Sequence, residues 1–245
     1  LPFIGAVSLL YACNVTRPFS NDQKVPADLY RDSSSADTAN MASLSWNEIF
    51  KDSLLQNLIK EGIQNNLDLK TAITNIKAAE ADYSQSRSAF YPSAGITGQG
   101  GLYEPSGMQA NTRQLYQLYA NASWQADIWG QLKSTKKAMY AALLQSQANK
   151  QAVQTQLVAD IAGAYYTLMA YDAQLSIAQT SVEKYAKDVE TMKMLKSSDV
   201  VTGAAVVQST ANYYAVMATI PDIKNNIRQT ENTLCLLLAK PSGPI

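Results

Sequence analysis

The sequence contains no histidine and only two cysteines. Histidine is the commonest general base and metal ligand, so every histidine-containing catalytic triad is excluded. Cys13 and Cys235 lie near opposite ends of the chain. They form neither a CxxC redox pair nor a zinc site. The motifs GxGxxG, GxxxxGK[ST] and HExxH are also missing. These absences disfavour an enzyme, and we expect no catalytic residue, no metal and no cofactor.

Charge is scarce and evenly balanced. Charged residues make up 16% of the 245 residues, against about 25% in typical soluble domains. Twenty Lys plus Arg match twenty Asp plus Glu, so the net charge is zero. The sequence therefore has no excess of positive charge that would attract nucleic acid, and we expect no nucleic-acid partner. Hydrophobic residues account for 47% of the chain, too large a share for wholesale disorder.

An apolar run occupies residues 1–12 and ends in Ala12, directly before Cys13. The run is too short to span a bilayer as a helix. Because it lacks the basic start of a complete signal peptide, we interpret it as the end of one. Its last residues and Cys13 resemble a bacterial lipoprotein box, which predicts cleavage before Cys13 and lipid on that cysteine. The alternative is a buried apolar N-terminus with a chance cysteine.

The next two segments differ in periodicity. Residues 13–44 are polar, contain two prolines and show no sustained period, which is typical of an extended tether. Residues 45–91 are predicted to be helical, with one pattern of apolar residues running from about Asp52 to Phe90. Pro92 ends this pattern, because proline disfavours the helical conformation in the residue before it.

The hydrophobic period changes to two within residues 92–129. In residues 93–103, and again in 116–128, the even-numbered positions are mainly apolar and the odd-numbered ones mainly polar. Such runs fit transmembrane barrel strands, although a soluble hairpin with one buried face has the same pattern. In the barrel interpretation, the polar face lines a water-filled lumen. The lumen-facing residues predicted for the second strand are Gln117, Asn121, Ser123, Gln125 and Asp127.

A long helical hairpin is predicted for residues 130–240. Residues 130–196 contain no proline, and apolar residues recur at alternate spacings of four and three over 157–192. This spacing is the seam of a coiled coil. A helix of this length extends about 100 Å at 1.5 Å per residue.

A second seam follows a break at residues 197–203. It covers residues 213–237, with a local kink expected at Pro221. The two seams predict antiparallel helices with a tip between them. The candidate tip residues are Asp199, Val200, Thr202 and Gly203.

Several short stretches carry a family resemblance through their order and spacing. They are WNEIF at 46–50, NNLDL at 65–69, AFYP at 89–92, SWQADIWG at 123–130, DIAGAY at 160–165 and LLLAKP at 236–241. Each is weak alone, but together they fall on the strand and helix segments that periodicity outlines. The sequence resembles the N-terminal half of TolC-like outer-membrane efflux proteins, of the lipoprotein (NodT/OprM-like) branch.

The resemblance implies a mainly α fold with a β-hairpin. Long antiparallel coiled-coil helices would form a periplasmic tunnel, and two amphipathic strands would belong to a trimeric transmembrane β-barrel. The implied function is a passive export duct for small molecules or drugs in a tripartite efflux system. Its implied partners are a homotrimer, a periplasmic adaptor, an inner-membrane transporter and outer-membrane lipid. The implied location is the outer membrane of a Gram-negative bacterium, with Cys13 as the lipid anchor.

The resemblance also gives the tip a role and shows where this sequence departs from the family. The tip residues become the candidate adaptor contact, for which the alternative is a solvated turn. The family usually has glycine where Ala239 stands and at the tip position that aligns with Asp199. Family members contain two similar repeats of helix, strand pair and helix pair. This sequence matches the first, so we expect half of a two-repeat protomer with the second repeat missing.

Two other classes of protein remain alternatives. A periplasmic adaptor also contains a long helical hairpin, but small soluble β domains should flank it. An enzyme would need a carboxylate pair such as Asp160 and Asp172. Twelve residues along one helix separate these carboxylates by about 18 Å, too far for them to cooperate.

Overall fold

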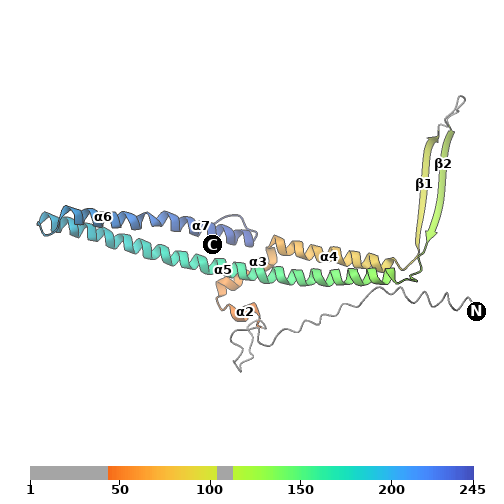
Figure 1. The fold of residues 1–245 in the computed structure, drawn as a ribbon, viewed down its shortest axis with the longest axis horizontal. Coiled ribbons are helices and arrows are strands. Elements are labelled where there is room, and N and C mark those ends of the chain that lie inside the picture. Colours follow the sequence, from red (N-terminus) through yellow and green to blue (C-terminus); the bar gives the residue numbers. More distant parts are fainter. Residues whose placement is uncertain (1–43, 104–112) are drawn as a thin grey trace, which may run out of the picture. The chain divides into compact units, whose positions relative to one another are not determined.

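The computed structural model describes residues 44–103 and 113–245. The predicted signal-peptide end 1–12, Cys13 and the tether as far as residue 43 lie outside the described residues. The chain divides into two units, Leu1–Leu44 and Ser45–Ile245. The second unit contains the described helices and strands, which Figure 1 labels. They are α2 (Trp46–Ile49), α3 (Ser53–Asn65), α4 (Leu67–Ser88), β1 (Ser93–Tyr103), β2 (Arg113–Ser123), α5 (Gln131–Ser197), α6 (Gly203–Met217) and α7 (Thr219–Leu237).

The single helical pattern expected from Asp52 to Phe90 is divided into α3 and α4. Asn66 interrupts it with an extended backbone, at φ −53° and ψ 132°. Its side-chain oxygen accepts a 2.9 Å hydrogen bond from the backbone N–H of Leu69 and so caps α4. Its side-chain nitrogen donates a 3.0 Å bond to the carbonyl of Leu237, at the end of α7. The helical segment is therefore divided into two helices, and a residue distant in sequence stabilises the break.

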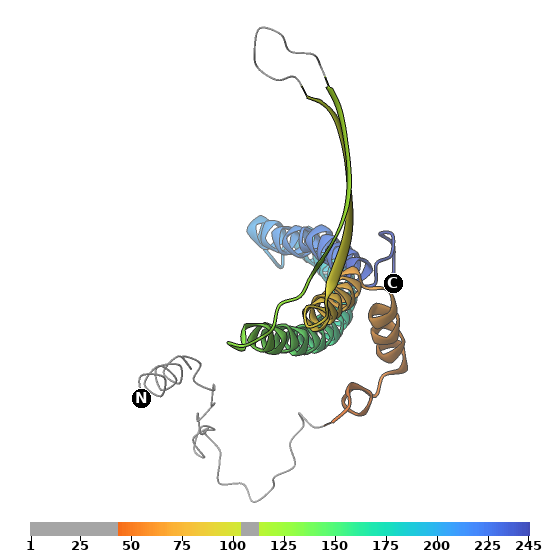
Figure 2. The same ribbon diagram turned by 90° about the vertical axis from the view of Figure 1, so that its right-hand side faces the viewer.

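The β-hairpin pairs β1 with β2 in antiparallel register over eleven residues of each strand. β1 covers residues 93–103, as predicted. The two strands lie side by side along their length in Figure 1 and Figure 2. β2 ends at Ser123, whereas strand alternation was expected to continue to Ile128. Gln125 and Asp127 therefore follow the strand, which corrects their placement within it.

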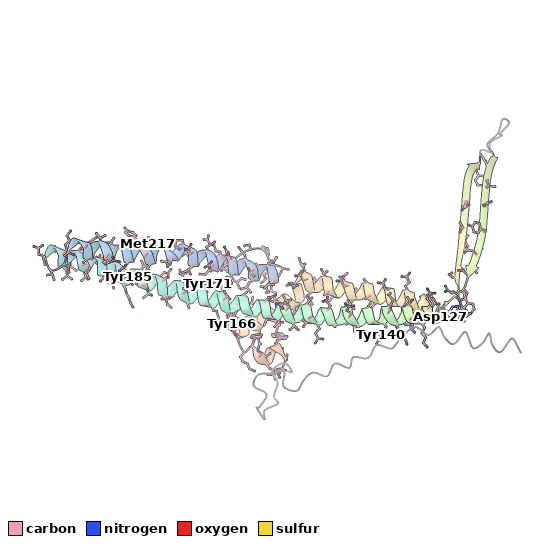
Figure 3. The ribbon with its side chains drawn as sticks, viewed as in Figure 1. Asp127, Tyr140, Tyr166, Tyr171, Tyr185 and Met217 are labelled. Carbon is pink, nitrogen blue, oxygen red and sulfur yellow. The ribbon has the colours of Figure 1, made fainter. Side chains whose placement is uncertain are left out.

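Asp127 instead caps the start of α5. Its two carboxylate oxygens accept bonds of 3.0 Å from the N–H of Leu132 and 2.9 Å from the N–H of Lys133. These N–H groups have no partner within the helix, and a carboxylate also suits the positive end of the helix dipole. Gly130 precedes the helix with φ 72°, a conformation that glycine adopts without steric cost. The expected lumen residue Asp127 thus fixes the turn from strand to helix (Figure 3).

The helical hairpin consists of one unbroken helix and two shorter ones. α5 has 67 residues, as the absence of proline predicted. α6 and α7 return along its C-terminal half, while α4 packs against its N-terminal half. The helical path is interrupted at Ala218, between α6 and α7. Pro221 accounts for this interruption, because its ring clashes with the carbonyl four residues earlier and it lacks an N–H to bond there. The interruption lies three residues before Pro221, where the sequence predicted a kink.

The hydrophobic core lies where α3, α4 and α7 meet the middle of α5. We call this region the junction. Gly62 allows a close approach there, since a Cβ on it would lie 2.4 Å from the Cδ1 atom of Ile161. Lys240 and Glu61 add an ion pair of 2.7 Å at its edge. The buried apolar residues of the junction are Leu55, Ile59, Leu69, Leu157, Val158, Ile161, Ala162, Leu168, Leu234 and Leu238.

Two helices end in the same left-handed turn. After α5, Asp199 has φ 57°, and after α7, Ala239 has φ 53°. In each turn the following N–H bonds a carbonyl five residues back, from Val200 to Leu195 at 3.0 Å and from Lys240 to Cys235 at 2.8 Å. This is the Schellman arrangement, in which glycine is the preferred left-handed residue. The two positions at which the sequence departs from the family's glycines are therefore the two that favour glycine physically.

None of the helices in the described ranges combines the length and the apolar character that a membrane-crossing helix requires.

Candidate functional site

The register of the hairpin gives it one apolar and one polar face. Each even-numbered residue of β1 pairs with an even-numbered residue of β2, and each odd with an odd. Because side chains alternate along a strand, the alternation of both strands is in phase. The apolar face carries the pairs Ala94–Ala122, Ile96–Ala120, Gly98–Leu118 and Gly100–Tyr116. Ile96 and Leu118 are 79% and 80% exposed, so none of the described helices covers this face.

The opposite face is mainly polar, although it also carries the pairs Thr97–Tyr119 and Gly101–Leu115. Gln99 pairs with Gln117, Gly95 with Asn121, and Ser93 with Ser123. The two serine hydroxyls lie 2.8 Å apart and form a hydrogen bond across the strands. The predicted lumen residues Gln117, Asn121 and Ser123 therefore share one face of β2. Gln125 and Asp127 lie beyond the strand.

The absence of a side chain at two glycines shapes the two faces. A Cβ on Gly95 would lie 3.0 Å from the side-chain oxygen of Asn121. A Cβ on Gly100 would lie 3.1 Å from the ring of Tyr116. These glycines let a larger cross-strand partner lie close over the backbone, with an amide on the polar face and an aromatic ring on the apolar face.

The open end of the hairpin, beside the helices, is rich in aromatic residues. The Trp124 indole N–H donates a 3.1 Å hydrogen bond to the carbonyl of Phe90, which ties the chain leaving β2 to the chain entering β1. Tyr91, Trp124 and Trp129 are largely exposed, as is Ile128. We call this end of the hairpin, together with the adjoining turns of α4 and α5, the hairpin foot.

The tip between α5 and α6 contains the other predicted site residues. Asp199 occupies the left-handed turn, and Val200 exposes 66% of its surface. Thr202 precedes α6 as its N-cap residue, and Gly203 is the first residue of that helix. The carbonyl of Thr202 accepts a 3.1 Å bond from the N–H of Ala205. The tip thus presents an exposed aliphatic side chain on an ordered, hydrogen-bonded turn.

A tyrosine and a carboxylate join α3 to α5 at the junction. The hydroxyl of Tyr165 donates a 2.6 Å hydrogen bond to Asp52, which also caps α3 through the N–H of Leu54. The bond from Tyr165 is the main cause that lowers the pKa of Asp52, and the bond from Leu54 adds to it. The same bond, with some burial, raises the pKa of Tyr165 to about 12. Tyr165 is the last residue of the resemblance stretch at 160–165, and Asp52 closely follows the stretch at 46–50.

Several residues cap helices in the structure although the sequence analysis did not assign them that role. Each of them nevertheless lies in a recognisable local pattern. Asp52 precedes an apolar helical pattern, as N-cap residues do. Asn66 lies in the resemblance stretch at 65–69, but its distant partner Leu237 could not be read from the sequence. Ser45 and Glu48 have the capping-box spacing and cap the short helix α2, which the periodicity did not resolve. Local signals thus indicated caps, and only the structure indicated which elements they join.

Comparison with known proteins identifies the family. The family model for outer membrane efflux proteins matches residues 58–240. The chain belongs to the outer membrane efflux protein family. That membership confirms the resemblance noted in the sequence.

Individual members of the family show similarity over most of this chain. The probable efflux pump outer membrane protein TtgC of Pseudomonas putida is 26% identical over 215 residues, which cover 85% of this chain and 44% of TtgC. The cation efflux system protein CusC of Escherichia coli K12 is 29% identical over 203 residues, covering 81% of this chain and 44% of CusC. The chain therefore spans less than half the length of these relatives.

Solved structures show the same fold. A crystal structure of CusC matches with a TM-score of 0.72 at 24% identity, covering 82% of this chain and 47% of that one. The outer membrane protein VceC of Vibrio cholerae matches with a TM-score of 0.69 at 21% identity, covering 80% of this chain and 49% of that one. These matches confirm the mainly helical fold with a two-stranded hairpin, and half of a two-repeat protomer.

Proposed function

We propose that the complete protein is the outer-membrane channel of a tripartite efflux system. In this proposal three protomers form a passive duct for small molecules or drugs. An inner-membrane transporter supplies the energy, and a periplasmic adaptor joins the two. The observation that carries the proposal is the in-phase alternation of β1 and β2, on a hairpin that continues into a helical hairpin. Family membership supports it.

The dimensions of the strands suit a membrane barrel. Eleven residues at about 3.4 Å per residue extend about 37 Å. Tilted by about 45°, such a strand spans about 26 Å, close to the apolar band of about 25 Å in outer-membrane barrels. In the proposed barrel Ala120 and Ile96 face lipid, while Gln117, Asn121 and Ser123 face the lumen. The unpaired outer edges of β1 and β2 pair with further strands of the trimer, because unpaired backbone groups are costly in lipid.

The proposal assigns each segment a place. Residues 1–12 are the end of the signal peptide, and 13–44 are a tether whose Cys13 carries lipid. Residues 45–91 are the first helical segment, 92–129 the strands with their loop, and 130–240 the hairpin of the periplasmic tunnel. Asp199, Val200, Thr202 and Gly203 at the tip contact the adaptor. The chain has no catalytic role in this proposal.

Cysteine labelling of the complete protein tests the barrel. Single cysteines replace Ala120 and Asn121, and a membrane-impermeant maleimide is applied to cells, with labelling after SDS denaturation as the total. We expect strong labelling at position 121 and weak labelling at 120. The neighbouring pair Ile96 and Thr97 on β1 is the matched control, and position 97 is expected to label more. Equal labelling within both pairs would exclude a barrel wall.

A further inference from the structure

Four basic side chains at the hairpin foot have no ion-pair partner among the described acidic residues. Arg87 lies in the last turn of α4, and Lys133, Lys136 and Lys137 lie near the start of α5. The rings of Tyr83 and Tyr140 are 5.4 Å apart, which places these turns of the two helices side by side. Among the residues that the structure describes, the ion pair found is Lys240 with Glu61. The four cations at the foot therefore have no carboxylate within ion-pair distance.

The position of the lysines is unfavourable within the protein itself. Lys133 is three residues before Lys136 and four before Lys137, so all three lie on one face of α5 and repel one another. They also lie near the positive end of the helix dipole, which favours anions. Asp127 already occupies the first N–H groups of the helix. The lysine cluster thus lowers helix stability, and an anionic partner outside the chain would compensate for it.

The local charge supports an anionic partner. Residues 82–92 and 127–140 contain the four basic residues and two acidic ones, Asp82 and Asp127. Four positive minus two negative charges leave an excess of two at the foot, in a chain whose net charge is zero. The basic groups are exposed or half-buried, so a partner can reach them.

The aromatic residues of the foot fix its depth in a bilayer. Tryptophan and tyrosine collect at the interface between the apolar core and the headgroups. Trp124, Trp129 and Tyr91 expose 65%, 72% and 74% of their surfaces at the end of an amphipathic hairpin. The Nζ atom of Lys136 lies 6.0 Å from the ring centre of Phe90, so a lysine and the aromatic residues share one level. If the hairpin spans the bilayer, Lys136 would therefore lie near the level of the lipid phosphates, with Lys133 and Lys137 within one helical turn of it.

We propose that Arg87, Lys133, Lys136 and Lys137 bind the phosphate groups of anionic phospholipids in the periplasmic leaflet. This inference rests on the proposed function, because the hairpin must enter the membrane for the foot to meet headgroups. Lysine is a flexible point charge without a fixed geometry of recognition, which suits mobile lipid phosphates. Basic residues at an anionic surface strengthen binding about fivefold each.

Tryptophan quenching by brominated lipids tests this inference on the complete protein. Trp46→Phe removes the tryptophan of α2, which leaves Trp124 and Trp129 as reporters within the described residues. The protein is reconstituted in mixtures of phosphatidylcholine with phosphatidylglycerol, in which one lipid or the other carries bromine in its acyl chains. We expect phosphatidylglycerol to bind at the foot about fivefold or more tightly than phosphatidylcholine at low salt. The preference is expected to weaken in high salt.

Charge variants locate the effect. Changing Lys133, Lys136 and Lys137 together to Gln is expected to bring the ratio of phosphatidylglycerol affinity to phosphatidylcholine affinity close to one. Changing all three to Arg is expected to leave this ratio unchanged. The matched control removes three charges far along the same helix, by changing Lys184, Lys187 and Lys193 to Gln, and is expected to retain the preference. Folding of every variant is checked by circular dichroism and trimer content.

The outcomes separate this inference from the function on which it rests. Equal binding of both lipids to the parent protein, or an unchanged preference in the Gln variant, would overturn the phosphate site while leaving the hairpin in the bilayer. An equal loss in the control variant would also overturn it, because the effect would then be one of net charge. Absence of quenching by either lipid would show that the hairpin is outside the membrane, and would overturn the proposed function as well.

Discussion

Gly62 permits α3 to cross α5 closely, and replacing it with alanine tests this packing. A Cβ at this position would lie 2.4 Å from Cδ1 of Ile161 but 3.6 Å from the nearest atom of Leu238. The clash is therefore with one methyl group. Ile161 is fully buried, so that methyl has little space into which it can move.

The expected magnitude combines two opposing effects. Overpacking a well-packed core costs about 1–3 kcal/mol. Alanine gains up to about 1 kcal/mol over glycine within a helix. Gly62→Ala is therefore expected to lower the free energy of unfolding by about 1–2 kcal/mol. For a protein of this size, each kcal/mol corresponds to about 2–4 °C in Tm.

A double-mutant cycle combines Gly62→Ala with Ile161→Val, which removes the clashing methyl group. Alone, Ile161→Val is expected to cost about 0.5–1.5 kcal/mol through the lost methyl contacts. In the double variant the next contacts of the new Cβ are the Cδ2 atom of Leu238 at 3.6 Å and the Cγ1 atom of residue 161 at 3.7 Å, both ordinary van der Waals distances. The double variant is therefore expected to be close to the parent in stability, with a coupling energy of about 1.5 kcal/mol or more between the two sites.

Thermal unfolding of all four proteins in detergent, followed by circular dichroism at 222 nm, measures the cycle. Tm is expected to fall in each single variant and to recover in the double variant. Additive losses in the double variant would refute the close approach of α3 and α5 at Gly62. An increase of Tm in Gly62→Ala alone would refute it as well, since only helix propensity would then be acting.

Three further predictions concern helix ends, a hydrogen bond and the tip. Ala239→Gly is expected to raise Tm by about 2–4 °C by relieving a left-handed alanine, and Asp199→Gly less, because aspartate tolerates that conformation better. A decrease in Tm would contradict the left-handed turns. Tyr165→Phe removes the bond to Asp52 and is expected to lower Tm at neutral pH. Because the pKa of Tyr165 is raised to about 12, the difference from the parent is expected to vanish as pH rises from 10 to 12. It is also expected to diminish in acid, as pH falls through the lowered pKa of Asp52. A pH-independent difference would exclude the pair. Val200→Asp in the complete protein is expected to leave trimer level unchanged, since surface substitutions usually stay within about 0.5 kcal/mol, but to increase drug accumulation in cells by weakening adaptor contact. Unchanged accumulation at equal trimer level would leave the tip a simple turn.

Periodicity predicted those parts of the fold that depend on a repeated local pattern. β1 and α5 follow directly from alternation and from an uninterrupted seam, and the seam residues Leu157, Ile161 and Leu168 are buried. The second seam is likewise buried at Ile223 and Leu234. A repeated apolar pattern predicts a helix and its buried face well, because all the apolar residues of the pattern lie on the same face and are buried together.

Features that depend on one distant contact were not predictable in the same way. The break at Asn66 is stabilised by Leu237, 171 residues away in sequence. The alternation beyond Ser123 continues in the sequence, but the strand ends there because Asp127 bonds the start of α5. The alternating pattern therefore assigned Asp127 to the lumen face, whereas in the structure its carboxylate caps the start of α5. An alternating pattern alone cannot distinguish these roles.

The single unbroken helix α5 forms one continuous rod that extends on both sides of the junction. Ile161 lies 30 residues from Gln131 and 36 residues from Ser197, which gives arms of about 45 Å and about 54 Å. On the opposite side α4 and α7 are separate segments, held to each other by the bond from Asn66 to Leu237. A tilt of about 10° at the junction would move the tip by about 9 Å, from the arm length that the helix rise gives. In such a rigid tilt the displacement of α5 would grow in proportion to the distance from the junction, and no backbone hydrogen bond of the helix would have to break.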